Sequence, residues 1–245
     1  MNKILQNILF GVLIISLMSL IFSGYEKNLD QKILSYESEI SSKINIDNVS
    51  HYRQWNDYEK KLFSGTFEVR KSDLENSLLF KSKTNPEFNN FNQLYKFLSD
   101  FDKPKLDLVY NTLDNIRESQ YLDSEEFVKV IVSFVQSITY EKIPDYDRFS
   151  IYTPVEFMSI FKGDCDTKVL FLFTILTKFG YDVIILNSDV DSHSILGINM
   201  PSKGKYKPHL GKRYYTWETT NKDWQPGDLH PSLSKMDSWY VALSN

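Results

Sequence analysis

The clearest helical pattern in the chain is an apolar run from Val169 to Phe179. Gly163 and Asp164 precede this run and Gly180 follows it, an arrangement typical of a capped helix with a left-handed residue just past its end. Because the run is apolar on nearly every side, we expect the helix to be buried in the domain. The pattern therefore places Cys165 in the first turn of a buried helix.

Apolar residues at three- and four-residue steps predict two helices before this one. The first runs from Lys105 to Arg117, and the second starts at Asp123 or Ser124 as its cap. Pro154 to Phe157 opens a further short helix that leads to Gly163. We interpret the two longer helices as scaffold. Their apolar faces carry Leu106, Val109, Tyr110, Leu113 and Ile116, and then Phe127, Val130, Ile131, Phe134, Val135 and Ile138.

After Gly180 the pattern changes to strands. The strand-like segments are 181–186, 193–200 and 214–219, and a loop rich in glycine and proline separates the last two. Two strands that flank such a loop are typical of an antiparallel pair, and we expect that pairing here.

The register of this pair decides which side chains meet. If Met200 pairs with Gly211, the constant total of opposing positions in an antiparallel pair places His193 opposite Glu218. A histidine and a carboxylate would then face each other at one end of the pair.

The segment from Ile4 to Phe22 is largely apolar and about long enough to cross a bilayer. The residues at its end are poorly suited to a signal peptidase, so we interpret the segment as an uncleaved single-pass anchor. Lys3 in front of it predicts a cytoplasmic N-terminus and an extracytoplasmic remainder. The alternative is a cleaved signal peptide, which would make the protein secreted or periplasmic.

The composition limits the possible functions. The 245 residues are 42% hydrophobic and 15% aromatic, which is enough for one sizeable core. The net charge is −4 and there is no dense cluster of lysine and arginine, so we expect no nucleic-acid partner. The single cysteine excludes an intramolecular disulfide and leaves nothing that resembles a structural zinc set, and we expect neither a metal nor a cofactor.

Cys165 therefore needs its own explanation. A free cysteine is often a small buried hydrophobe, and this alternative stays open. Its polar neighbours, Asp164 and Asp166, and its position at a helix start favour chemistry instead. Unpaired backbone N–H groups and the positive end of a helix dipole favour a thiolate, and the thiolate is the nucleophilic form of cysteine.

A thiol, an imidazole and a carboxylate are the parts of a nucleophile, its base and the group that orients the base. The imidazole of His193 can take the thiol proton near neutral pH and later return it to a leaving group. Glu218 would hold the imidazole in the required tautomer. Taken singly, His193 has the alternative of an ordinary surface histidine and Glu218 that of an ordinary strand carboxylate, but the predicted register joins them.

Several short motifs follow one another between Ser124 and His230. They are Val135-Gln136-Ser137-Ile138-Thr139-Tyr140, Thr153-Pro154-Val155-Glu156-Phe157, Gly163-Asp164-Cys165-Asp166, Phe179-Gly180-Tyr181-Asp182-Val183, His193, and Trp217-Glu218-Thr219-Thr220. In order, spacing and local context this set resembles the bacterial branch of the transglutaminase-like superfamily, which shares the papain-related thiol fold.

The resemblance implies an α+β, papain- or transglutaminase-like fold in which the buried helix carries the nucleophilic cysteine at its N-terminus and packs on an antiparallel β-sheet. We expect a membrane-spanning N-terminal helix to precede it. The implied triad is Cys165, His193 and Glu218, acting on an amide through an acyl-enzyme. The acid is usually aspartate in this superfamily, and glutamate is one methylene longer. The Cys165 N–H is the natural oxyanion donor, with Tyr140 as the candidate second donor.

The predicted organisation is an anchor or signal peptide over residues 1–24, a mainly helical region over 25–123, and a transglutaminase-like catalytic core over 124–245. The leading hypothesis is a membrane-anchored, extracytoplasmic thiol enzyme that acts on peptide or side-chain amides, as a cysteine peptidase rather than a transglutaminase. Its substrate would be a peptide or protein, with cell-wall peptide as one candidate. The alternative is a non-catalytic module of the same fold that binds peptide or cell-wall material. A third hypothesis is a structural partner in a membrane complex.

Overall fold

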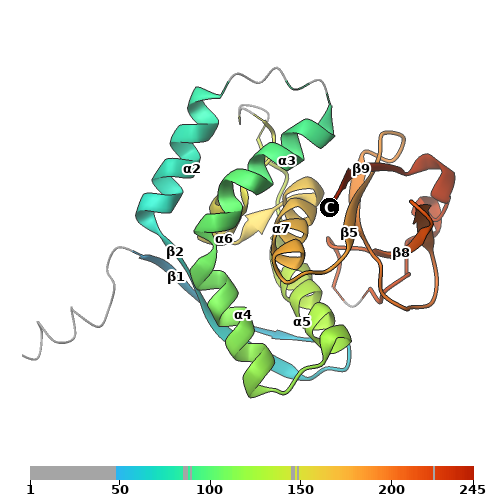
Figure 1. Ribbon diagram of the computed structural model, residues 1–245, viewed down its shortest axis with the longest axis horizontal. Helices are drawn as coiled ribbons and strands as arrows, with labels where there is room; N and C mark the ends of the chain where they lie inside the picture. The colour runs from blue at the N-terminus through green and yellow to red at the C-terminus, as the bar shows by residue number, and fades with distance from the viewer. Residues whose placement is uncertain (1–47, 85–87, 89, 145–146, 148, 223) are drawn as a thin grey trace, which may run out of the picture. The chain divides into compact units, whose positions relative to one another are not determined.

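Helix α7 (Cys165–Lys178) is the central element of the computed structural model, which describes residues 48–84, 88, 90–144, 147, 149–222 and 224–245 (Figure 1). Asp164 caps its start by accepting a hydrogen bond from the Thr167 N–H at 3.0 Å. Gly180, with a φ of 82°, takes the left-handed conformation just beyond its end. Every residue from 167 to 176 is buried, as the apolar pattern predicts.

Helices α3, α5 and α6 pack directly against α7. Capping boxes fix the starts of two of them, through Asp123 with Glu126 on α5 and Thr153 with Glu156 on α6. The described helices before α7 are α2 (Lys71–Lys83), α3 (Phe91–Asp102), α4 (Asp107–Ser119), α5 (Ser124–Ser137) and α6 (Pro154–Ile160), with a short 3-10 turn η1 (Lys103–Lys105). Two more 3-10 turns, η2 (Pro231–Leu233) and η3 (Met236–Ser238), lie near the C-terminus.

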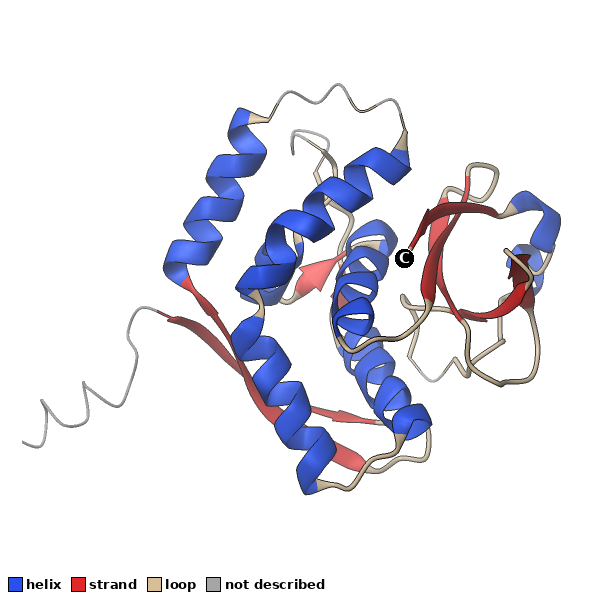
Figure 2. Cartoon of the chain, viewed as in Figure 1, coloured by secondary structure: helices blue, strands red, loops and turns tan. Residues whose placement is uncertain are grey.

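A curled antiparallel sheet packs against α7 from another side (Figure 2). Its strands, in the order β7-β8-β6-β5-β9, are β7 (Tyr206–His209), β8 (Lys212–Trp217), β6 (His193–Ile198), β5 (Val183–Ser188) and β9 (Tyr240–Ser244). Strands β5 and β6 are almost wholly buried and contact α7. The sheet therefore carries His193, the first residue of β6, on a strand that lies against the central helix.

Two strands outside this sheet, β1 (Asn48–Asn56) and β2 (Leu62–Arg70), form an antiparallel ribbon that packs on α4, α5 and α6. Aromatic rings make this contact. The ring of Phe67 stacks on that of Phe134 with centroids 4.3 Å apart, and the ring of Trp55 lies 4.9 Å from Phe134. The ribbon thus supports α5, which in turn supports α7.

A short parallel pair leads into α7. Its strands are β3 (Thr139–Tyr140) and β4 (Lys162–Gly163). A Cβ atom on Gly163 would meet Thr167 Cγ2 at 2.8 Å and Phe157 Cδ2 at 3.1 Å. Because only glycine permits this close approach, the pair is held tightly against the start of the helix.

The predicted fold class is wrong in one component, the membrane-spanning N-terminal helix. No helix in the described part of the chain is long and apolar enough to cross a membrane. Even α5 and α7 have 14 residues each, whereas a span needs about 20. The segment for which the span was predicted, 4–22, and the predicted region 1–24 lie outside the described residues. The structure is an α+β fold with a curled antiparallel sheet.

The predicted pairing of the two strands is correct in direction and wrong in register. Strands β6 and β8 are antiparallel neighbours, but Trp217 lies opposite Leu196, whereas the predicted register places it opposite Ser194. The cause is β7, which forms a tight hairpin with β8 through Leu210 and Gly211, both with positive φ, where we predicted a loop. A shift of two positions keeps every side chain on its face, because strand side chains alternate with period two.

Gly163→Ala should destabilise the folded protein, because the added methyl group would displace Thr167 or Phe157. We expect the free energy of unfolding to fall by about 1–3 kcal/mol. A lower urea midpoint with an unchanged slope would show this loss. Ser202→Ala, on a surface loop, is the control and should stay within about 0.5 kcal/mol of wild type. An unchanged midpoint for Gly163→Ala would contradict the tight contact between β4 and α7.

Candidate active site

Cys165 is the first residue of α7 and is 6% exposed. Asp164, the cap, and the parallel pair β3–β4 hold the backbone that leads into it. The first N–H groups of a helix have no partner within the helix, so this turn presents partial positive charge to the surroundings of the sulfur. The position therefore suits a nucleophilic thiolate.

The other two predicted residues are joined by a hydrogen bond, with His193 Nε2 2.9 Å from Glu218 Oε2. His193 begins β6 and Glu218 directly follows β8, so the register shift makes them diagonal neighbours on one face. Cys165 also acts on the His193 ring and raises its pKa, so the thiol lies near this ring. Since Glu218 occupies Nε2, the ring offers Nδ1 to the sulfur. The structure thus brings all three predicted residues together.

Glu218 is 2% exposed, and protein donors occupy both of its carboxylate oxygens. Oε1 accepts hydrogen bonds from the N–H of Thr219 at 2.9 Å, and from the N–H and hydroxyl of Thr220 at 2.8 and 2.7 Å. The backbone carbonyl of Glu218 accepts a further bond from Gln136 Nε2 at 2.7 Å. These contacts fix the position from which the carboxylate reaches His193.

The charges of the three side chains support one another. Burial by itself would lower the pKa of His193, but its interactions with Cys165 and Glu218 outweigh this effect and raise the pKa to about 10. Burial would likewise raise the pKa of Glu218, yet its bonds to His193 and Thr220 lower it. The site therefore favours an imidazolium held between a carboxylate and the sulfur at neutral pH.

Tyr140 lies on β3 directly opposite Gly163, close to the start of α7, and its side chain is 51% exposed. Partial burial raises its pKa, and so do the negative charges of Cys165 and Asp164. An electrostatic influence of this kind requires proximity. Tyr140 thus lies near the start of α7, and its phenol is a hydrogen-bond donor.

A buried polar network, which sequence reasoning missed, ties the residue after the cysteine to the residue after the histidine. Asp166 Oδ1 accepts a hydrogen bond from the Ser194 hydroxyl and another, at 2.5 Å, from the Tyr95 hydroxyl on α3. Asn187 Nδ2 donates to the Tyr95 oxygen at 3.2 Å. Both ends of the network adjoin the site, so it fixes the start of α7 relative to the start of β6. In the sequence, the only indication of this network is that Asp166 directly follows Cys165 and Ser194 directly follows His193.

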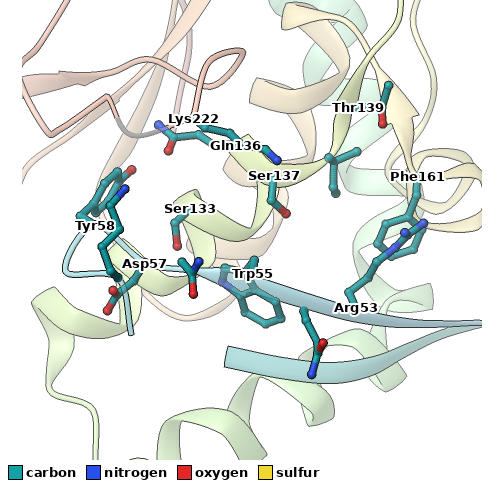
Figure 3. Close-up of a pocket in the computed structure, with 14 residues that line it drawn as sticks. Arg53, Trp55, Asp57, Tyr58, Ser133, Gln136, Ser137, Thr139, Phe161 and Lys222 are labelled. Atoms are coloured by element: carbon teal, nitrogen blue, oxygen red, sulfur yellow. The ribbon is translucent and has the colours of Figure 1, made fainter. Parts of the chain in front are cut away.

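Two hollows border these segments. The first, of about 270 Å³, lies beside the histidine and its carboxylate and is lined by Asp191, His193, Glu218, Thr220, Asn221, Trp224, His230 and Leu233. The second, of about 350 Å³, lies between the end of β1 and the end of α5, with Trp55, Ser133 and Lys222 among its lining residues (Figure 3). Gln136 lines the second hollow and donates to the carbonyl of Glu218, which lines the first, so one hydrogen bond links the two linings.

Comparisons with known proteins identify no relative, since no family model, no curated protein and no solved structure matches the chain. Within the described residues, no group of three or more His, Cys, Asp or Glu side chains is placed to hold a metal ion.

His193 should make the stability of the protein depend on pH. Its folded pKa lies above the unfolded value of about 6.5, so the folded state binds this proton more tightly. The resulting stabilisation is complete below the unfolded value and is lost as the pH rises toward the folded value of about 10. In urea unfolding between about pH 6 and pH 9, wild type should lose stability more steeply than His193→Asn. Parallel curves would contradict the raised pKa.

Tyr95→Phe should lower the free energy of unfolding by about 1–3 kcal/mol, because Asp166 loses a buried donor. Thermal or urea unfolding measures this difference. Tyr121→Phe is the matched control, since that side chain is 92% exposed, and it should be nearly neutral. Equal midpoints for the two variants would show that the network does not stabilise the contact between the start of α7 and the start of β6.

Proposed function

We propose that this protein is a cysteine-dependent enzyme that acts on peptide or side-chain amides through an acyl-enzyme. The observation that carries the proposal is the His193 ring, which is hydrogen-bonded to Glu218 at 2.9 Å and lies near enough to Cys165 for the thiol to raise the pKa of the ring. An imidazole between a thiol and a buried carboxylate is the arrangement that activates a nucleophile and then protonates a leaving group.

In the proposed reaction the Cys165 thiolate attacks the amide carbonyl carbon, and a C–S bond forms as the carbonyl oxygen becomes an oxyanion. His193 gives its proton to the amide nitrogen, the C–N bond breaks, and the amine leaves. Water then attacks the thioester carbonyl carbon while His193 takes one of its protons. The C–S bond breaks, the carboxylic acid leaves, and the thiolate–imidazolium pair is regenerated. Hydrolysis is proposed in preference to transfer because water is the only acceptor it requires.

The oxyanion needs donors at the point where its charge develops. The N–H of Cys165, in the first turn of α7, is the first candidate. Tyr140, which stays neutral because its pKa is raised, is the second. The proposal thus assigns a role to each residue that the resemblance to the transglutaminase-like superfamily implies.

The glutamate in place of the superfamily's usual aspartate is compatible with this role. The His193–Glu218 bond is of normal length, and the Thr219 and Thr220 donors hold the longer side chain in place. The proposal is therefore supported by a carboxylate that is buried and hydrogen-bonded to His193.

Turnover of a fluorogenic peptide-amide library tests the proposal. Cys165→Ala should abolish turnover. Glu218→Gln keeps the size of the side chain and removes its charge, so turnover should fall, by less than the loss of about 10⁴ known for a serine triad, because a thiol is already partly ionised near neutral pH. Glu218→Asp should keep part of the activity.

Full activity in Glu218→Gln alongside an inactive Cys165→Ala would show that Glu218 does not orient the base. Peptide binding without turnover by wild type would overturn the enzyme proposal and favour the non-catalytic binding module.

A further inference from the structure

Lys168 is a buried cation that the proposed reaction does not use. It lies one turn after Cys165 on α7, its residue is 0% exposed, and its Nζ donates a hydrogen bond of 2.7 Å to the Ile138 carbonyl. An ammonium group carries three donors, and burying a charge without compensation is strongly unfavourable. A cation retained at such a position calls for a nearby negative charge.

Lys168 and Glu218 are both hydrogen-bonded to the end of α5. Ile138, which accepts the Lys168 bond, caps α5, and Gln136 in the last turn of the same helix donates to the Glu218 carbonyl at 2.7 Å. Lys168 and Glu218 are therefore bound to the same short stretch of chain. Both residues are buried, and electrostatic interactions are stronger in the protein interior than at the surface.

The electrostatics of Lys168 agree with this geometry. Burial lowers the pKa of Lys168 to about 8, the charge of Glu218 opposes that effect, and Lys222 adds to it. The charged groups that act on the ammonium are thus Glu218, after β8, and Lys222, on the following loop. With this pKa the amine remains mostly protonated at neutral pH.

We propose that Lys168 is a positioning residue for the triad, whose buried ammonium supplies the positive charge that keeps the Glu218 carboxylate ionised against His193. This inference rests on the proposed thiol chemistry of the site. When the thiolate and the imidazolium offset each other, the carboxylate is left as one uncompensated negative charge, and Lys168 balances it. Removing a single member of such a buried set leaves its partner uncompensated.

The test measures the rate at which iodoacetamide alkylates Cys165 as a function of pH. Cys165 is the only cysteine, so the rate reports on one thiol, and the reagent reacts with the thiolate. The acid side of the profile reports protonation of the triad as a coupled unit. In Lys168→Met the Glu218 carboxylate should be protonated at a higher pH, and the acid limb should move up by about one pH unit.

A second variant separates the loss of the Lys168 charge from the loss of its hydrogen bond to Ile138. Lys168→Gln also removes the charge but keeps a hydrogen-bond donor, so it should shift the acid limb as Lys168→Met does. It also answers the question if Lys168→Met fails to fold. Lys103→Met is the matched control, because Lys103 is a partly buried lysine that bonds Thr177 near the far end of α7, and it should leave the profile unchanged.

A double-mutant cycle tests the link to Glu218. In a Glu218→Gln background, Lys168→Met should no longer shift the acid limb, because the charge that it compensates is gone. A rate that falls equally at every pH, or a shift that persists without Glu218, would overturn the proposal and leave Lys168 a structural residue. If wild type and His193→Asn have the same profile, the thiol-enzyme proposal itself fails, whatever Lys168 does.

Discussion

Helix α7 is apolar on nearly every side, and this constraint shapes the rest of the molecule. A helix of this kind has no face for water, so it must be covered all round by other elements. Helices α3, α5 and α6 cover part of it, and strands β5 and β6 cover another part. The first turn lies where these layers meet. A side chain at this point, Cys165, is reached both by the sheet and by the ends of the surrounding helices.

The same arrangement explains why the polar groups of the site are so closely tied. Around the start of α7 a set of buried groups replaces the water that each would otherwise bind. Asp166 takes its donors from α3 and β6, and Glu218 takes donors from its own turn and from α5. Buried carboxylates that are held by several donors in this way make a site rigid. Rigidity of this kind suits chemistry that needs three side chains in one geometry.

Local features of this site could be predicted from the sequence. The cap at Asp164, the left-handed Gly180 and the antiparallel direction of β6 and β8 each follow from residue types over a few positions. The register could not be predicted, because β7 lies in a segment whose prolines and glycines indicate a loop. Despite this error in the register, His193 and Glu218 lie on the same face of the sheet, because a shift of two positions does not change the face on which a side chain lies.

Long-range contacts were beyond the reach of local patterns. Tyr95 contacts Asp166 from a helix much earlier in the chain, and no periodicity links the two. The sequence likewise shows Lys168 as a polar residue in an apolar helix, and only the fold shows what surrounds it. The membrane-spanning helix in the predicted fold class came from hydropathy alone, and no described helix supports that component.

Intact-protein mass spectrometry would detect the acyl intermediate that we propose on Cys165 and show whether its formation depends on His193. The protein would be mixed with an activated acyl ester, quenched in acid and weighed. We predict one acyl group on Cys165, removed by hydroxylamine as a thioester should be, and little or none in His193→Asn at neutral pH. No adduct in wild type would rule out the proposed acyl-enzyme, and equal adducts in wild type and His193→Asn would rule out His193 as its base.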